Sequence, residues 1–156
     1  MFRLLEPGDT FIDIGANIGY YSVLGALAVG SRGRVLAFEP NPVSGAMLRE
    51  NTNRLHENQG YAIIVAHAVA LSDSDGSAVL TQSADSGLVM LDNSLETGIK
   101  VQTRRLDSFA TGFSKIRMVK LDVEGHEREC LLGASALLES RAIEHLVYED
   151  HSGYPG

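Results

Sequence analysis

The sequence has little cysteine, no extended cluster of basic residues and no long apolar stretch, and each absence narrows the kind of protein it encodes. Cys130 is the single cysteine, so an intrachain disulfide is excluded, and its apolar neighbours favour a buried thiol over a catalytic one. The longest basic cluster is Arg104-Arg105 and the net charge is −7. Both features argue against nucleic acid as a partner.

The apolar stretches at 20–29 and 61–71 are too short to span a bilayer. The N-terminus does not show a basic region followed by an apolar one, as a signal peptide would. We therefore expect a cytoplasmic protein with no membrane partner. A length of 156 residues with 44% hydrophobic residues fits one globular domain.

Two segments near the N-terminus carry the clearest functional signal. Residues 9–22 combine an apolar run, the turn Gly15-Ala16-Asn17-Ile18-Gly19 and the start of a helix. Residues 35–42 contain a second apolar run, which ends at Glu39. A strand, a glycine turn, a helix and a second strand ending in a carboxylate are typical of an α/β sheet that binds an adenosine-containing cofactor through its ribose.

The glycine spacing helps to choose the cofactor. A dinucleotide turn uses a second glycine so that the backbone can approach a pyrophosphate, and Asn17 stands at that position here. S-adenosylmethionine, which has no phosphate, fits better, and Glu39 would accept hydrogen bonds from both ribose hydroxyls. Two alternatives stay open: a purely structural turn, and a nicotinamide-dependent oxidoreductase, for which the sequence identifies no catalytic tyrosine or histidine.

Apolar runs of strand length alternate with longer periodic segments, which predicts βαβ units. The predicted strands lie at 10–14, 34–38, 62–67, 116–122 and 143–149. The predicted helices start at Asn17, as an N-cap, at Pro42 and near Gly125. Val43, Met47 and Leu48 of the second helix are expected to face the core. The expected fold is α/β and Rossmann-like, with a doubly wound, mostly parallel sheet that has helices on both faces.

The segment 68–106 interrupts this alternation. A turn cluster at 72–77 separates 69–71 from 78–81, which predicts a β-hairpin inserted after the third strand. The polar stretch 81–100 is expected to be a loop that is either solvated or in contact with substrate. A short strand is predicted at 99–104.

Ionisable residues gather at the end of the predicted fourth strand, in residues 120–127. Because side chains alternate along a strand, Lys120 and Asp122 share one orientation, which Glu124 extends if the strand continues. Ligands of open α/β sheets collect at the carboxyl ends of strands. Lys120 beside Asp122 is therefore either a structural ion pair or a catalytic set with shifted pKa values.

The ordered set of motifs resembles the FkbM family of class I, S-adenosylmethionine-dependent methyltransferases. The resemblance rests on residues 11–22, Ala37-Phe38-Glu39-Pro40, Ala70-Leu71-Ser72-Asp73 with Gly76, Leu106-Asp107-Ser108-Phe109, and residues 120–127. It implies S-adenosylmethionine as cofactor and methyl transfer to a hydroxyl of a sugar or natural-product-like small molecule.

The resemblance also implies a role for each matched residue. The implied cofactor contacts are Asp13, Gly15, Asn17 and Gly19 around the methionine part, Glu39 at the ribose, and Ala70 and Asp73 at the adenine edge. Asp122 and Glu124 would lie nearest the methyl group and the acceptor.

Methyl transfer to a hydroxyl requires an aligned acceptor oxygen and a base that removes its proton. The catalytic candidates are Asp122, which we favour, Glu124 and His126, with Glu149 and His151 as a second pair. A divalent cation bound by such residues would be another way to acidify the hydroxyl. No tight ligand spacing requires one, so no metal is expected.

The ends of the chain differ from the family pattern. Members are expected to have a helical segment before the position of Gly8 and, after the fifth strand, a helix and two more strands. We therefore expect residues 1–156 to be a single class I methyltransferase domain, truncated at both ends and without the last two of seven strands. The fifth strand would then be an exposed edge, and a homodimer is expected to cover it. A non-catalytic domain that only binds S-adenosylmethionine is the alternative.

Overall fold

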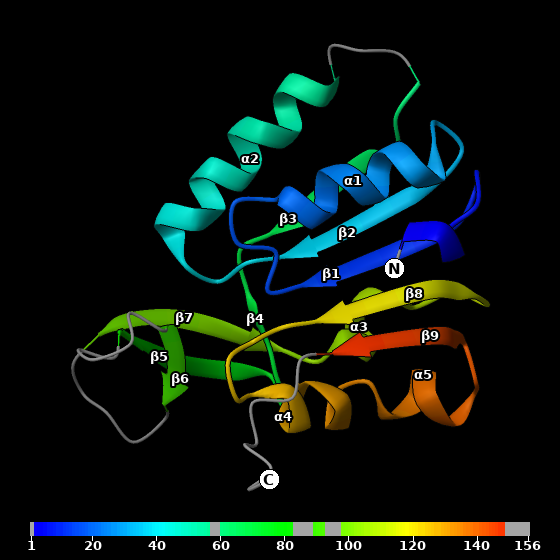
Figure 1. Cartoon of the computed structure of the whole chain (residues 1–156). Helices are drawn as coiled ribbons and strands as arrows, with labels where there is room; N and C mark the ends of the chain where they lie inside the picture. Colours follow the sequence, from blue (N-terminus) through cyan, green and yellow to red (C-terminus); the bar gives the residue numbers. More distant parts are fainter. Residues whose placement is uncertain (1, 57–59, 83–88, 93–97, 149–156) are drawn as a thin grey trace, which may run out of the picture.

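The computed structural model describes residues 2–56, 60–82, 89–92 and 98–148. Its larger sheet has five parallel strands in the order β3-β2-β1-β8-β9 (Figure 1). These strands are β1 (Thr10–Ile14), β2 (Arg34–Phe38), β3 (Ile63–His67), β8 (Ile116–Leu121) and β9 (Ile143–Tyr148). The predicted doubly wound parallel sheet is confirmed.

Helices cover both faces of this sheet, as predicted. They are the 3₁₀ turn η1 (Phe2–Leu4) and the α-helices α1 (Tyr20–Val29), α2 (Pro42–His56), α3 (Leu106–Phe109), α4 (Glu127–Leu132) and α5 (Ser135–Glu139). Because side chains alternate along a strand, Phe11 of β1 packs with α1 and α2, whereas Ile12 packs with α3, α4 and α5. Among the described residues, one apolar cluster therefore packs on each face of the larger sheet, and a third lies within the insertion.

The sheet order places a crevice beside β1. The chain leaves β1 toward β2 and β3 on one side, and β8 and β9 lie on the other (Figure 1). Ligands of open α/β sheets bind where the strand order reverses, at the carboxyl ends of the strands. A ligand site is therefore expected at the segments that follow β1, β2 and β8.

The insertion between β3 and β8 is a second sheet of four strands, in the order β4-β7-β5-β6. Its strands are β4 (Ala70–Leu71), β5 (Gly76–Gln82), β6 (Val89–Asp92) and β7 (Ile99–Arg104). The predicted pairing of 69–71 with 78–81 is wrong, because β4 and β5 both pair with β7, which lies between them. The antiparallel partner of β5 on its other side is β6, inside the stretch predicted as a loop.

Three details of the helices differ from the prediction. Asn17 is not the N-cap of α1, which starts at Tyr20 after Gly19 and has no side-chain cap. Leu48 is buried as predicted, but Val43 and Met47 are 68% and 47% exposed, because α2 packs against the sheet through Leu48. The third predicted helix is divided into α4 and α5 near Gly133, where the backbone passes so close to Ser72 that a Cβ would lie 2.0 Å from its carbonyl oxygen.

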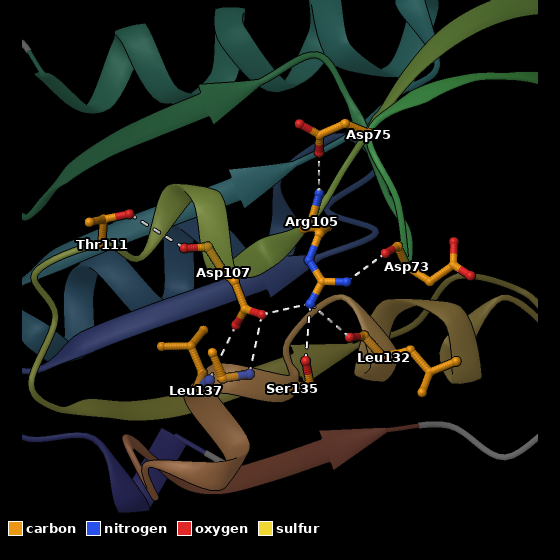
Figure 2. Close-up of polar contacts among 9 residues, drawn as sticks. Asp73, Asp75, Arg105, Asp107, Thr111, Leu132, Ser135 and Leu137 are labelled. Atoms are coloured by element: carbon orange, nitrogen blue, oxygen red, sulfur yellow. Dashed lines mark hydrogen bonds and ion pairs between the residues drawn. The ribbon is translucent and has the colours of Figure 1, made fainter.

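A polar network around Arg105 joins the insertion to α3, α4 and α5 (Figure 2). The backbone N–H of Arg105 donates to Asp75 Oδ1 at 3.0 Å, and its guanidinium donates to the carbonyl of Asp73 at 2.6 Å and to Asp107 Oδ2 at 2.9 Å. The guanidinium also donates to the Leu132 carbonyl and to Ser135 Oγ. Arg105 therefore connects elements that are distant in sequence.

Asp107 completes this network from the first turn of α3. Its two carboxylate oxygens accept the backbone N–H groups of Ala136 and Leu137, each at 3.2 Å, near the start of α5 (Figure 2). Such N–H groups have no partner within the helix. Asp107 of the Leu106-Asp107-Ser108-Phe109 motif therefore has a structural role that links α3 to α5.

Cys130 is buried, as expected from its apolar neighbours. Its thiol donates to the Leu71 carbonyl at 3.0 Å, and burial raises the pKa of Cys130 to about 12. A thiol with that pKa is a poor nucleophile near neutral pH. In the part of the chain that the structure describes, no helix is both long and apolar enough to cross a membrane.

Candidate active site

A cavity of about 580 Å³ opens where the carboxyl ends of β1, β2 and β8 meet. This volume is typical of small-molecule sites. The residues predicted from sequence that line it are Gly15, Asn17, Glu39, Ala70, Asp122 and Glu124. The insertion contributes to the wall as well, through Leu80 of β5.

The glycine turn after β1 lines the cavity and packs against the backbone that follows β8. Gly15 has φ 74°, and a Cβ at this position would lie 1.8 Å from the carbonyl oxygen of Asp122. Only glycine permits this approach. The N–H groups of Gly15 and Ala16 both donate to the Phe38 carbonyl, which ties the turn to the end of β2. Gly19 is similarly confined, since a Cβ there would lie 2.6 Å from Leu48 Cδ1.

Glu39 lies directly after β2 and is only 8% exposed. Its Oε2 accepts the backbone N–H of Asn17 and its Oε1 accepts that of Asn41, each at 2.8 Å. Burial raises the pKa of Glu39, and the two N–H groups partly oppose this shift. A carboxylate has about four acceptor positions, so both oxygens keep capacity for donors of a ligand in the cavity.

Asp13, in β1, is fully buried and does not itself line the cavity. Its Oδ2 accepts a hydrogen bond from Ser22 Oγ at 2.6 Å. Among the described residues Oδ1 has no hydrogen-bond partner, but Lys120 Nζ lies 3.3 Å from it, within ion-pair reach. Burial is the main cause that raises the pKa of Asp13, and the Lys120 charge opposes it.

Asp122 and Glu124 follow β8 and face the cavity. Oδ2 of Asp122 lies 3.3 Å from Lys120 Nζ. Glu124 has φ 53°, an unusual conformation for a residue with a side chain. The loop is held in this shape by Glu127, whose Oε1 accepts the N–H groups of Val123 and Gly125. Strained backbone of this kind is frequent at functional sites.

Four predicted site residues do not line the cavity: Asp13 and Gly19, described above, and His126 and Asp73. His126 Nε2 contacts Ser72 Oγ at 3.1 Å, so its ring is engaged with the insertion. Asp73 is exposed and accepts hydrogen bonds from Ser72 Oγ and Ser74 Oγ. Glu149 and His151 fall outside the described residues.

Other cavity residues were not predicted from the sequence. Tyr20 and Tyr21, which follow the glycine turn, and Asn41 and Ser44, at the start of α2, all line the wall. Asn41 Oδ1 accepts the N–H of Val43 at 2.9 Å and that of Ser44 at 3.4 Å, so it caps α2. An asparagine directly before Pro42 is the sequence signal that could have identified this cap.

The charges on the wall favour a cationic ligand. Glu39, Asp122 and Glu124 are acidic, and Lys120 is the basic residue of the wall. Within the described ranges, no group of three or more histidine, cysteine, aspartate and glutamate side chains is arranged to hold a metal ion.

The model of the Methyltransferase FkbM domain matches residues 13–155. The chain belongs to this family. It is 31% identical over 150 residues to the hexuronic acid methyltransferase AglP of Haloferax volcanii, covering 95% of this chain and 58% of AglP. It is 31% identical over 181 residues to the 31-O-demethyl-FK506 methyltransferase FkbM of Streptomyces tacrolimicus, covering 94% of this chain and 67% of the relative.

A solved structure of methyltransferase FkbM from Methylobacillus flagellatus has the same fold. The two superpose with a TM-score of 0.61 at 19% identity, covering 88% of this chain and 32% of that chain. This chain therefore corresponds to one part of longer relatives. Membership of the FkbM family implies a methyl donor.

Proposed function

We propose that this chain binds S-adenosylmethionine in the cavity and is the core of an enzyme that transfers the methyl group to a hydroxyl of a sugar or natural-product-like small molecule. The main supporting observation is Glu39, buried beside the glycine turn with acceptor capacity left on both oxygens. The names of AglP and of the Streptomyces relative, one acting on a hexuronic acid and one on an oxygen of a natural product, support the acceptor class.

The residues of the cavity fit this cofactor. The turn that contains Gly15, Asn17 and Gly19 would surround the methionine part, Glu39 would accept hydrogen bonds from the ribose hydroxyls, and Ala70 would lie beside the adenine. The acidic wall suits a ligand with positive charge. When bound, S-adenosylmethionine supplies a methyl group that is already activated for transfer.

The protein's own contribution would be to orient the acceptor hydroxyl and take its proton. Asp122 is the favoured base because its carboxylate faces the cavity from the end of β8 and is 31% exposed. Glu124 is the second choice from the same loop. His126 is less suited in this conformation, since its Nε2 contacts Ser72.

A labelled-methyl transfer assay tests the proposal. The protein is incubated with methyl-labelled S-adenosylmethionine and a panel of hydroxyl acceptors that includes a hexuronic acid glycoside and 31-O-demethyl-FK506. We expect label in at least one acceptor and a 100-fold or larger loss in Asp122→Asn, the range for a general base. Lys115→Met removes an exposed charge remote from the cavity and is the control.

Other outcomes would replace the proposal. Binding of S-adenosylmethionine without transfer to any acceptor would indicate a domain that only binds the cofactor. Tight binding of NADH in its place would indicate an oxidoreductase.

A further inference from the structure

Lys120 is a buried cation that contacts both the glycine turn and the acidic loop. It is the penultimate residue of β8, and its side chain is 8% exposed. Its Nζ donates a hydrogen bond to the Gly15 carbonyl at 3.3 Å. Oδ1 of Asp13 and Oδ2 of Asp122 each lie 3.3 Å from the same atom. Three oxygens from two segments, the end of β1 with its turn and the loop after β8, therefore surround one ammonium group.

The fourth side of this ammonium faces an aromatic ring. Nζ lies 5.1 Å from the centre of the Tyr21 ring, within the range of a cation–π contact. Tyr21 in turn stacks on Phe2 of η1, with ring centres 6.1 Å apart. Contacts with β1, the glycine turn, the loop after β8 and α1 therefore hold the ammonium group in one position.

The contacts of Lys120 join two parts of the site that have different tasks. Gly15 belongs to the turn that would hold the methionine part of the cofactor, and Asp122 is the favoured base. A carboxylate on a loop needs a partner to keep one orientation. Among the described residues, the basic group in contact with Asp122 is Lys120.

We propose that Lys120 is a positioning residue that fixes the Asp122 carboxylate relative to the cofactor turn, and so aligns proton removal with methyl transfer. This inference rests on the proposed function, because it assigns to Asp122 the role of base. Lys120 acts through Asp122 and does not itself take the proton.

A simpler role for Lys120 would be to neutralise the buried charge of Asp13. The two roles can be separated because Asp13 and Asp122 are different partners. Lys120→Met alone would leave Asp13 buried without a counter-ion, which is strongly destabilising. The double variant Asp13→Asn/Lys120→Met removes both charges of that pair and keeps an acceptor for Ser22 Oγ.

The experiment measures stability, affinity for S-adenosylhomocysteine, kcat and acceptor KM in four proteins: wild type, Asp13→Asn, the double variant and Lys115→Met. Lys115 is an exposed lysine whose ion pair with Glu144 lies away from the cavity, which makes Lys115→Met a matched Lys→Met control. For the double variant we expect a folded protein, changes below about threefold in affinity and KM, and a fall in kcat of roughly 100-fold, the cost of a misplaced catalytic group. Asp13→Asn alone keeps Lys120 beside Asp122, so it measures the part of any fall in kcat that comes from removing the buried charge of Asp13.

Two results with an active wild type would overturn the inference. One is a double variant with the kcat of the wild type, which would reduce Lys120 to a counter-ion of Asp13. The other is a parallel loss of cofactor affinity and kcat, which would assign Lys120 to the cofactor site as a whole. A folded wild type that methylates no acceptor would instead overturn the proposed function, and the role of Lys120 with it.

Discussion

The three carboxylates around the glycine turn are compensated in different ways. Glu39 is held by two backbone N–H groups, Asp13 by a hydroxyl and Lys120, and Asp122 by Lys120. Burial raises the pKa of both Glu39 and Asp13. Their ionised forms are therefore less favourable than those of exposed carboxylates, and a cationic ligand would stabilise them.

The raised pKa of Glu39 predicts a pH dependence of cofactor binding. The ionised carboxylate accepts ribose hydroxyls, so affinity for S-adenosylhomocysteine should fall on acidification and begin to do so above the ordinary pKa of 4.5. Glu39→Gln should bind roughly 10- to 100-fold more weakly at neutral pH, because it loses charged hydrogen bonds, and should lack this dependence. Calorimetric titrations between pH 4.5 and 8 provide the measurement.

The control for this prediction is Glu50→Gln, which changes an exposed glutamate of α2 and should behave as the wild type. The effect on folding has the opposite sign: a raised carboxyl pKa contributes stability that is complete below the unfolded value and is lost as pH rises through the folded one. Constant affinity down to pH 4.5 would contradict the assigned role of Glu39.

Gly15 and Gly112 provide a test of close approach at the glycine turn. Both residues have positive φ, 74° and 91°. A Cβ at Gly15 would meet the Asp122 carbonyl, whereas a Cβ at Gly112 would have no other atom within 4 Å. Gly112→Ala should cost only the left-handed strain, about 1–2 kcal/mol. Gly15→Ala should cost at least about 1–3 kcal/mol more, from overpacking. Denaturant unfolding compares the two, and equal losses would mean that β1 and β8 can separate at this point.

At the scale of elements, the sequence predicted the main sheet well. The apolar runs at 10–14 and 34–38 match β1 and β2 because strands buried on both faces are nearly continuous in hydrophobicity. The pairing inside the insertion was missed because local turn signals at 72–77 do not reveal that β7, some thirty residues later in the chain, would take the place between the two flanks.

The sequence also predicted several of the residues that line the cavity, whereas their roles stay predictions. Gly15, Glu39 and Asp122 end strands or follow them, and the topology alone brings such positions together. The position of His126 could not be predicted, because it depends on the contact with Ser72 of the insertion. The exposure of Val43 and Met47 likewise depends on which narrow face of α2 meets the sheet.

The cap formed by Asp107 predicts a measurable contribution to α5. Asp107→Ala removes the acceptor for the N–H groups of Ala136 and Leu137 and the partner of Arg105, so the free energy of unfolding should fall by about 1–2 kcal/mol. Denaturant unfolding gives the value. Glu139→Ala, at the exposed end of the same helix, should stay within about 0.5 kcal/mol of the wild type. Equal effects of the two variants would contradict the capping role.

At the scale of the whole molecule, the outer strand β9 is the feature with the clearest consequence. Within the described residues β9 pairs with β8 alone, at the end of the strand order. Unpaired strand edges favour association with another chain. Self-association through β9 therefore stays a prediction for this chain.

Light scattering of the 156-residue chain, combined with hydrogen exchange, checks this prediction. We expect a dimer in which the outward N–H groups of β9 are protected, and a shift toward monomer when Val147→Pro removes an N–H from the strand. A monomer with unprotected β9 at all concentrations would contradict it.

Calorimetric titration with S-adenosylmethionine and S-adenosylhomocysteine shows directly whether the cavity binds the cofactor, with Glu39→Ala as the matched variant. We expect micromolar binding of both ligands by the wild type and loss of binding in the variant, which removes the buried carboxylate at the end of β2. A folded wild type that binds neither ligand would contradict this expectation, and would mean that this chain has the scaffold of the FkbM family without its cofactor site.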